Sequence, residues 1–373
     1  MNRIAFMGLV VALSSATTTS ACAQSMSHGS ATESYEERLL IGGVADSVLQ
    51  LSVTRSDHLT TGPSGDLYVL DPVGARIFVI DTAGRLKATM GSRGHGPGEM
   101  IDPAAIAADS RGKIYINDYG TGAIQVWDSA GVFQDEIRPQ SPPLGGLGAG
   151  RNGEIYHETY VVKDGVMQKA LIRDSAGGSH IVTSMDRSPR HKADFPTCGG
   201  LNLTVAPLLT PELVWAARDS IVAFSRGLQF VVRILVNAKR VAVIQREGRP
   251  ARVTPDGAME AAKRKQIQVG TCIVPPEELV RGMGYSEKYP TVERLAVDPT
   301  GRIWVRWGPR AGEVSGETAV YSLSGKKLAV VEEHLPFPDA FLPGTSGFWS
   351  LSLDSVDVPQ LHLFVSSVNT SGN

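Results

Sequence analysis

One short phrase recurs along this chain, and it constrains the fold more than any other feature of the sequence. The phrase is a glycine, a charged residue, a branched apolar residue, an aromatic residue and usually a second branched apolar residue. It stands at residues 65–69, 112–116 and 301–305, and a fourth copy at 153–157 ends on a histidine. Each copy follows a cluster of turn-forming residues. The spacing predicts a repeated structural unit rather than one irregular core.

A second pair of strand-like segments follows the first two copies at equal spacing. Residues 76–80 and 123–127 are rich in β-branched and aromatic residues, and each segment leads into Asp-x-Ala-Gly at 81–84 and 128–131. Glycine in such a turn adopts the positive φ that a hairpin needs. Each unit therefore reads as four antiparallel strands, which is typical of a β-propeller blade.

The remaining segments complete a ring. Residues 219–244 and 347–365 predict two further blades, and residues 38–53 are expected to supply a strand that closes the last blade. The predicted fold is all-β, a six-bladed β-propeller of four-stranded antiparallel blades over residues 38–373. A short helical insertion is predicted near 254–269, because Thr254 and Pro255 form a helix start.

The N-terminus has the layout of a secretory signal peptide over residues 1–23, with Arg3, an apolar stretch at 4–13 and then small polar residues. Two interpretations stay open. Cleavage after Ala23 would leave a flexible leader at 24–37, whereas residues 19–22 resemble a lipobox in which Cys22 is lipidated. We expect a periplasmic or secreted protein, or one anchored to the cell envelope by lipid, without a transmembrane segment.

Two cysteines remain after signal cleavage, Cys198 and Cys272. An even pair in an exported chain predicts a disulfide, with two buried free thiols as the alternative. The formal net charge is −2, which does not favour nucleic acid as a partner. We expect a monomer.

The blade phrase resembles the NHL type of six-bladed β-propeller. The clearest match runs from Gly91 through Gly94, Gly98 and Pro103 into the strand at 105–109, and the resemblance is good over residues 60–136. It implies a fold whose members bind proteins, peptides, RNA or glycans, and whose relatives include lyases and lactonases. The Asn-Arg pair usual in that family is reduced to Arg76 in the first blade, so the resemblance supports the fold more than any activity.

The sequence contains none of the catalytic motifs that we tested. His157-Glu158 lacks the second histidine of a zinc helix, no Gly-x-Ser-x-Gly elbow occurs, and the glycine-rich loop 91–98 lacks the Gly-Lys ending of a phosphate loop. We therefore predict a non-enzymatic binding or scaffold protein that presents one face to a peptide, protein or glycan. The alternative is a metal-assisted enzyme of the lactonase or lyase kind, with a divalent cation at the propeller axis. We predict no other cofactor, and assign neither metal ligands nor catalytic residues.

Ligand-binding candidates follow from blade geometry. Polar and aromatic residues just after each blade's second strand are expected to meet at one end of the ring, where aromatic and arginine side chains are favoured anchors. These candidates are Asp71, Asp118, Tyr119, His157, Tyr160, Arg306, Trp307 and Arg310.

Overall fold

The computed structural model describes residues 31–43, 51, 53, 55–265, 267–269, 272–331, 340–344, 347–354 and 358–366. The expected signal peptide and Cys22 lie outside these residues. Within them the regular structure is mostly β-strand, with two short helices and two 3-10 turns, η1 (Ser56–His58) and η2 (Pro196–Cys198).

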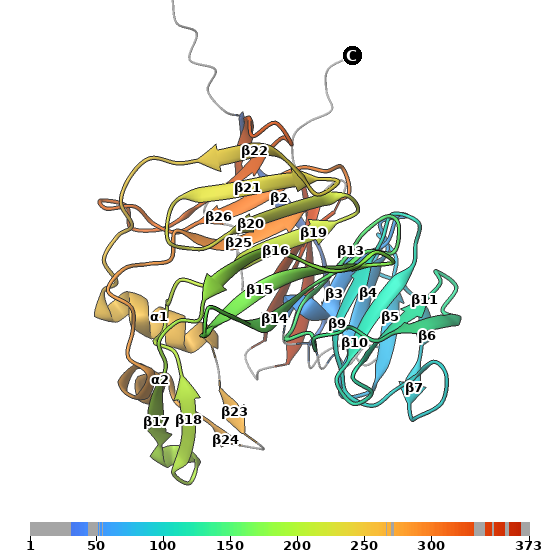
Figure 1. Cartoon of the computed structure of the whole chain (residues 1–373), viewed down its shortest axis with the longest axis horizontal. Coiled ribbons are helices and arrows are strands. Elements are labelled where there is room, and N and C mark those ends of the chain that lie inside the picture. The colour runs from blue at the N-terminus through green and yellow to red at the C-terminus, as the bar shows by residue number, and fades with distance from the viewer. Residues whose placement is uncertain are drawn as a thin grey trace, which may run out of the picture.

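The first half of the chain forms three blades of four antiparallel strands (Figure 1), and the inner strands of blades three and four are joined by one parallel bridge, Ala149 to Arg218. Blade one contains β3 (Leu59–Thr61), β4 (Leu67–Asp71), β5 (Arg76–Ile80) and β6 (Leu86–Met90). Blade two contains β9 (Pro103–Ala108), β10 (Ile114–Asp118), β11 (Ala123–Trp127) and β12 (Phe133–Ile137). Blade three contains β13 (Leu147–Ala149), β14 (Ile155–Lys163), β15 (Val166–Ser175) and β16 (Gly178–Asp186).

Three more blades follow in the second half. Blade four contains β19 (Val214–Arg218), β20 (Ile221–Ser225), β21 (Val231–Val236) and β22 (Lys239–Gln245). Blade five contains β25 (Val292–Val297), β26 (Ile303–Trp307), β27 (Glu317–Tyr321) and β28 (Lys327–Val331). Blade six contains β29 (Ala340–Pro343), β30 (Gly347–Leu353), β31 (Pro359–Ser366) and, from the start of the chain, β2 (Tyr35–Gly42).

The predicted six-bladed propeller is confirmed, and its ring is closed. The innermost strands touch in the cyclic order β3, β9, β13, β19, β25, β29 and back to β3. Closure depends on β2, which pairs antiparallel with β31 from Tyr35 opposite Ser366 to Gly42 opposite Gln360. Strand β1 (Ala31–Glu33) adds to the outer edge of blade five, parallel to β28. The flexible leader expected through residue 37 is therefore wrong for residues 31–33 and 35–37, which are strands.

The recurring phrase is explained by the first turn of the blade. In blade two the carboxylate of Asp109 accepts hydrogen bonds from the backbone N–H groups of Arg111 and Lys113, both at 2.9 Å. Asp298 does the same in blade five for Thr300 and Arg302. The glycine of each phrase has φ between +82° and +86°, which only glycine adopts without strain. The repeat therefore encodes the inner hairpin of the blade.

Apolar residues fill the space between neighbouring blades. Between blades one and two, Leu70, Ile77 and Met100 pack with Ile114 and Ile116 of the next blade, and all five are fully buried. Burial of that kind contributes about 1.5–3 kcal/mol for each large side chain.

Two long connections leave the ring and fold together into what we call the cap. One connection carries the hairpin β17 (His191–Phe195) and β18 (Leu201–Val205), and the other carries α1 (Pro255–Lys265), β23 (Gln268–Val269), β24 (Cys272–Ile273) and α2 (Pro276–Met283). Phe195, Leu208 and Leu279 belong to its small core. The predicted disulfide is confirmed: Cys198 is bonded to Cys272, with Cα atoms 5.7 Å apart. Helix α1 was predicted, whereas α2 and the hairpin were not.

The strand directions define two faces of the ring. The inner strand of each blade begins at one face of the ring, which we call the entry face. The second and the outermost strands of each blade end at this same face. The cap follows the ends of β16 and β22, so it lies on this side. Tyr35 and Ser366, which stand opposite each other where β2 pairs with β31, lie at the opposite face.

Candidate ligand-binding site

Around the start of the inner strands, four blades contribute polar and aromatic side chains to one area of the entry face. We call this set the entry-face cluster, and it consists of Arg55, Asp57, Tyr119, Glu158, Lys169 and Trp215. The charges of three of them influence the pKa of the Tyr119 phenol: Arg55 lowers it, whereas Asp57 and Glu158 raise it. The cluster therefore joins blades that are well separated in sequence.

Blade one contributes an ion pair. The guanidinium of Arg55 lies 2.5 Å from the carboxylate of Asp57, just before β3. Gly145 and Gly146 approach this pair so closely that a Cβ on Gly146 would lie 2.9 Å from an Asp57 oxygen. The glycines thus let the connection before blade three pass beside the ion pair.

Blades three and four contribute a second, less exposed group. Lys169 on β15 lies 2.8 Å from the Glu158 carboxylate and 3.3 Å from that of Glu212. The indole N–H of Trp215, on the inner strand of blade four, donates to Glu158 at 2.8 Å. Burial raises the pKa of Glu158, although the Lys169 ammonium and the Trp215 donor act against it. Burial opposes protonation of Lys169, but the two carboxylates outweigh it and raise its pKa.

His58 follows Asp57 of the cluster directly in the sequence. Its side chain is buried, and its Nδ1 atom has no hydrogen-bond partner among the described residues. Burial and the neighbouring Arg55 lower the pKa of His58 to about 4. The imidazole is therefore neutral at neutral pH, and one ring nitrogen is left unused.

Tyr119 is the most accessible aromatic residue of the cluster, with 44% of its surface exposed. Its backbone N–H donates to the carbonyl of Asp102 at 2.9 Å, which fixes the loop after β10. Partial burial raises the pKa of its phenol, so the hydroxyl stays protonated and can donate a hydrogen bond. A ring fixed beside paired charges suits a ligand that has both flat apolar faces and polar groups.

Two predicted site residues, Asp71 and Asp118, stabilise the backbone of the entry face. Asp118 is fully buried and accepts from the N–H groups of Ile101, Asp102 and Gly120 at 2.8–3.0 Å. Asp71 accepts from Gly74 and pairs with Arg76 at 2.8 Å. Among the predicted residues, Tyr119 alone belongs to the cluster.

The two predicted residues of blade three lie elsewhere. His157 is completely buried, and its Nε2 lies 2.9 Å from Asp174 on the next strand. Tyr160 lies further along β14, and the guanidinium of Arg187 stacks 4.9 Å from its ring centre.

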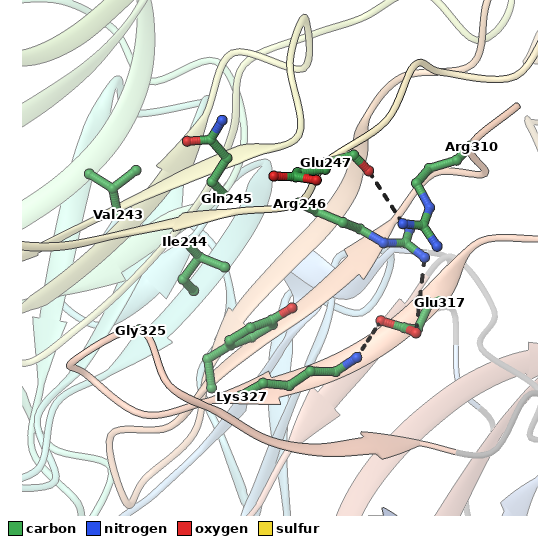
Figure 2. A pocket seen from close by; sticks show the side chains of 10 residues that line it. Val243, Ile244, Gln245, Arg246, Glu247, Arg310, Glu317, Gly325 and Lys327 are labelled. Atoms are coloured by element: carbon green, nitrogen blue, oxygen red, sulfur yellow. Dashed lines mark hydrogen bonds and ion pairs between the residues drawn. The ribbon is translucent and has the colours of Figure 1, made fainter. Parts of the chain in front are cut away.

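The three predicted residues of blade five are separated from the cluster as well. Trp307 is fully buried and donates to the Tyr321 hydroxyl at 3.1 Å, while Arg306 lies 3.6 Å from Glu293. Arg310 lines a groove of about 610 Å³ between β22 and the outer strands of blade five (Figure 2). Its guanidinium pairs with Glu313 at 2.5 Å, and Arg246 lies 3.1 Å from the same carboxylate. The cations and carboxylates of this groove largely neutralise each other.

Sequence reasoning missed five members of the cluster, all but Tyr119. Arg55 and Asp57 precede the repeat, whereas Lys169 and Trp215 belong to blade three and the poorly matching blade four. Glu158 adjoins the predicted His157, and the alternation of side chains along β14 could have identified it as the neighbour on the other face.

The described residues hold no group of three or more His, Cys, Asp or Glu side chains placed to bind a metal ion. No described helix is long and apolar enough to span a membrane.

Comparison with known proteins supports the fold. Residues 60–192 match the model of a family described as a 6-bladed beta-propeller, DUF5128. A search of curated proteins found no match. Similar solved structures include a Bacteroides fragilis protein described as exported, with 11% identity, coverage of 90% of this chain and 95% of that chain, and a TM-score of 0.48.

Two other similar structures belong to proteins that are named for what they do. One is the calcium-binding protein regucalcin of Agrobacterium tumefaciens, with 13% identity, coverage of 90% and 96%, and a TM-score of 0.42. The other is virginiamycin B lyase of Staphylococcus aureus, with 12% identity, coverage of 86% and 89%, and a TM-score of 0.36.

Proposed function

We propose that this β-propeller is an exported binding protein whose entry-face cluster holds a glycan or a short peptide. The observation that carries the proposal is the accessible ring of Tyr119, whose phenol pKa is influenced by charged groups from other blades. Stacking on an aromatic ring and hydrogen bonding to paired charges is a combination that both ligand classes use.

The paired charges give the site its specificity. Glu158 and Lys169 are only 15% and 23% exposed, and each has its protein partner already in place. A ligand hydroxyl or amide can add a hydrogen bond to such a pair without moving it, so little ordering entropy is lost on binding. Arg55 and Glu212, at 54% and 53% exposed, are accessible to the ligand's charged or polar ends.

The test is a screen of the purified protein against immobilised glycans and short peptides, followed by calorimetry with each hit. Tyr119→Ala should weaken binding at least about 10-fold, since truncating a well-packed aromatic anchor costs about 2 kcal/mol or more. Tyr285→Ala is the matched control, because Tyr285 is 39% exposed on the connection after the cap helix α2. Equal affinity of the Tyr119 variant and the native chain would overturn the proposal.

The same titration tests the metal-assisted alternative. Binding that disappears with a chelator and returns with a divalent cation would favour a cation at the axis over the cluster. Binding that is unchanged by a chelator would leave the cluster as the site.

Export and oligomeric state are separate parts of the proposal. Residues 1–23 and the Cys198–Cys272 bond support passage into an oxidising compartment. The intact mass of the mature protein distinguishes an N-terminus at Gln24 from a lipidated Cys22. Light scattering on the eluted protein tests the proposed monomer.

A further inference from the structure

Blade six carries a chain of three side chains that the proposed function does not use. Ser352 lies on β30, His362 on β31 and Glu37 on β2, so they occupy three neighbouring strands. The Ser352 hydroxyl lies 2.6 Å from Nε2 of His362, and Nδ1 of His362 lies 2.8 Å from the Glu37 carboxylate. Both ring nitrogens are thus engaged by different partners.

The carboxylate decides the direction of the hydrogen bonds. An ionised Glu37 can only accept, so Nδ1 of His362 carries the proton and donates it. The neutral ring then has its lone pair on Nε2, and the Ser352 hydroxyl donates to that atom. This tautomer is the one in which a histidine can take a proton from a serine while a carboxylate holds the ring.

His362 bonds to one of the two serines near it on β30 and not to the other. Ser350 stands directly opposite His362 in the strand register, yet its hydroxyl is buried without a hydrogen-bond partner among the described residues. His362 instead bonds diagonally to Ser352. Its ring is also held by stacking on Phe364, with ring centres 6.1 Å apart and planes 19° apart.

The three groups can be reached from solvent. The Glu37 side chain is 46% exposed and that of His362 is 16% exposed, while Ser352 is partly exposed near the entry-face end of β30. Phe348 and Phe364 on the same side of the blade pack against Trp304 of blade five. The three polar side chains therefore lie next to the apolar contact between blades five and six. An open site of this kind suits a small substrate.

We propose that Ser352 is a nucleophile toward small activated acyl esters, with His362 as its general base and Glu37 as the residue that positions the base. The Ser352 oxygen bonds to the ester carbonyl carbon while its proton passes to Nε2 of His362. The carbon–oxygen bond to the leaving group then breaks, and His362 returns the proton to that oxygen. The oxygen of a water molecule then bonds to the acyl carbon as His362 takes a proton from it. The bond from that carbon to the Ser352 oxygen breaks, the acid leaves, and His362 returns the proton to Ser352.

Covalent labelling is the sharpest test, because Ser352 lies on a regular strand and we expect slow turnover. The probe is a fluorophosphonate, in which the serine oxygen bonds to phosphorus and fluoride leaves as the proton passes to His362. We expect one adduct per chain, located on Ser352 by peptide mass spectrometry. p-Nitrophenyl acetate should give a matching burst of about one nitrophenol per chain.

Variants separate a catalytic role from a structural one. Ser352→Ala should abolish the adduct, and His362→Gln should slow labelling by about 100-fold, the usual size of a general-base contribution. Glu37→Gln should slow it less. Ser350→Ala and His95→Gln are matched controls that should leave the rate unchanged.

Melting temperatures measured on each variant show that the ring is intact. An intact protein that forms no adduct at Ser352, or labels equally fast without His362, would overturn the assignment. The site is distinct from the entry-face cluster, so labelling and ligand binding succeed or fail separately.

Discussion

Arg218 on the inner strand of blade four reaches the inner strand of blade one, where its guanidinium donates to the Thr61 carbonyl at 3.0 Å and to the Thr61 hydroxyl at 3.1 Å. The side chain is buried, and its Nε has no partner among the described residues. Burial lowers the pKa of Arg218, which the nearby Asp219, Asp298 and Asp109 oppose. This contact ties opposite sides of the ring together at the face away from the cap.

Replacing Arg218 by Met tests whether the contact stabilises the ring. The change removes both hydrogen bonds to Thr61 and leaves buried acceptors unpaired, so we expect a loss of about 2–4 kcal/mol in the free energy of unfolding. Urea denaturation measures it. Arg240→Met, at an exposed position of β22, is the control and should change stability by less than about 0.5 kcal/mol. Equal stability of the two variants would mean that the free-energy cost of burying the Arg218 guanidinium equals the stabilisation from its hydrogen bonds.

His58 should make stability depend on pH. Its folded pKa of about 4 lies below the ordinary value of 6.5, so the unfolded chain binds the proton first as the pH falls. The stabilisation is present above pH 6.5 and is lost between 6.5 and about 4, a change on the order of 3 kcal/mol. The unfolding free energies of the native chain and of His58→Gln should be measured across this pH range. Within it, the free energy of the native chain should fall more steeply with decreasing pH than that of the variant. Outside it, the two slopes should be equal. Parallel curves throughout would show that His58 titrates alike in both states.

Closure of the ring by β2 predicts a sharp contrast between two adjacent residues. Ile41 is 7% exposed in the core between blades six and one, whereas Leu40 is 51% exposed. Ile41→Ala should cost about 2–5 kcal/mol and Leu40→Ala less than about 1 kcal/mol. Thermal unfolding compares them. A large effect at Leu40 would place β2 in the wrong register, since a shift of one residue exchanges the two faces.

The Cys198–Cys272 bond should stabilise the cap more than the ring. It joins connections 74 residues apart in sequence, for which chain entropy alone gives about 4 kcal/mol. In the double Cys→Ser variant, amide exchange should become faster in β17 and α2 and stay unchanged in β10. A reducing agent should reproduce this in the native chain and have no effect on the variant. Unchanged exchange in β17 and α2 of the double variant would show that the cap is stable without the bond.

The fold could be predicted because its information is local. The Asp-capped turns recur with Gly112 and Gly301 in the same conformation, and they identify the blades even where the strands diverge. Helix α2 was also within reach, because Pro276 and two acidic residues form a helix start. It was missed because it lies outside the repeat.

The site could be predicted only in part because its members come from different blades. Tyr119 was found from its place after a second strand, but Asp118 in the same position caps a loop instead. Nothing local distinguishes an aspartate that binds backbone N–H groups from one that faces a ligand. Glu37 and His362 are further apart still, at opposite ends of the chain, so only ring closure brings them together.

The pairing of β2 with β31 also determines how the ring would respond to mechanical force. Tyr35 and Ser366 stand opposite each other at one end of an antiparallel pair, so tension between them pulls the two strands apart sideways. The ladder bonds would then carry the load one after another instead of all at once, as they would if the strands were drawn along their length. Stretching the chain by its two ends should therefore first detach β1 and then peel β2 from blade six at low force, opening the ring while the other blades stay folded.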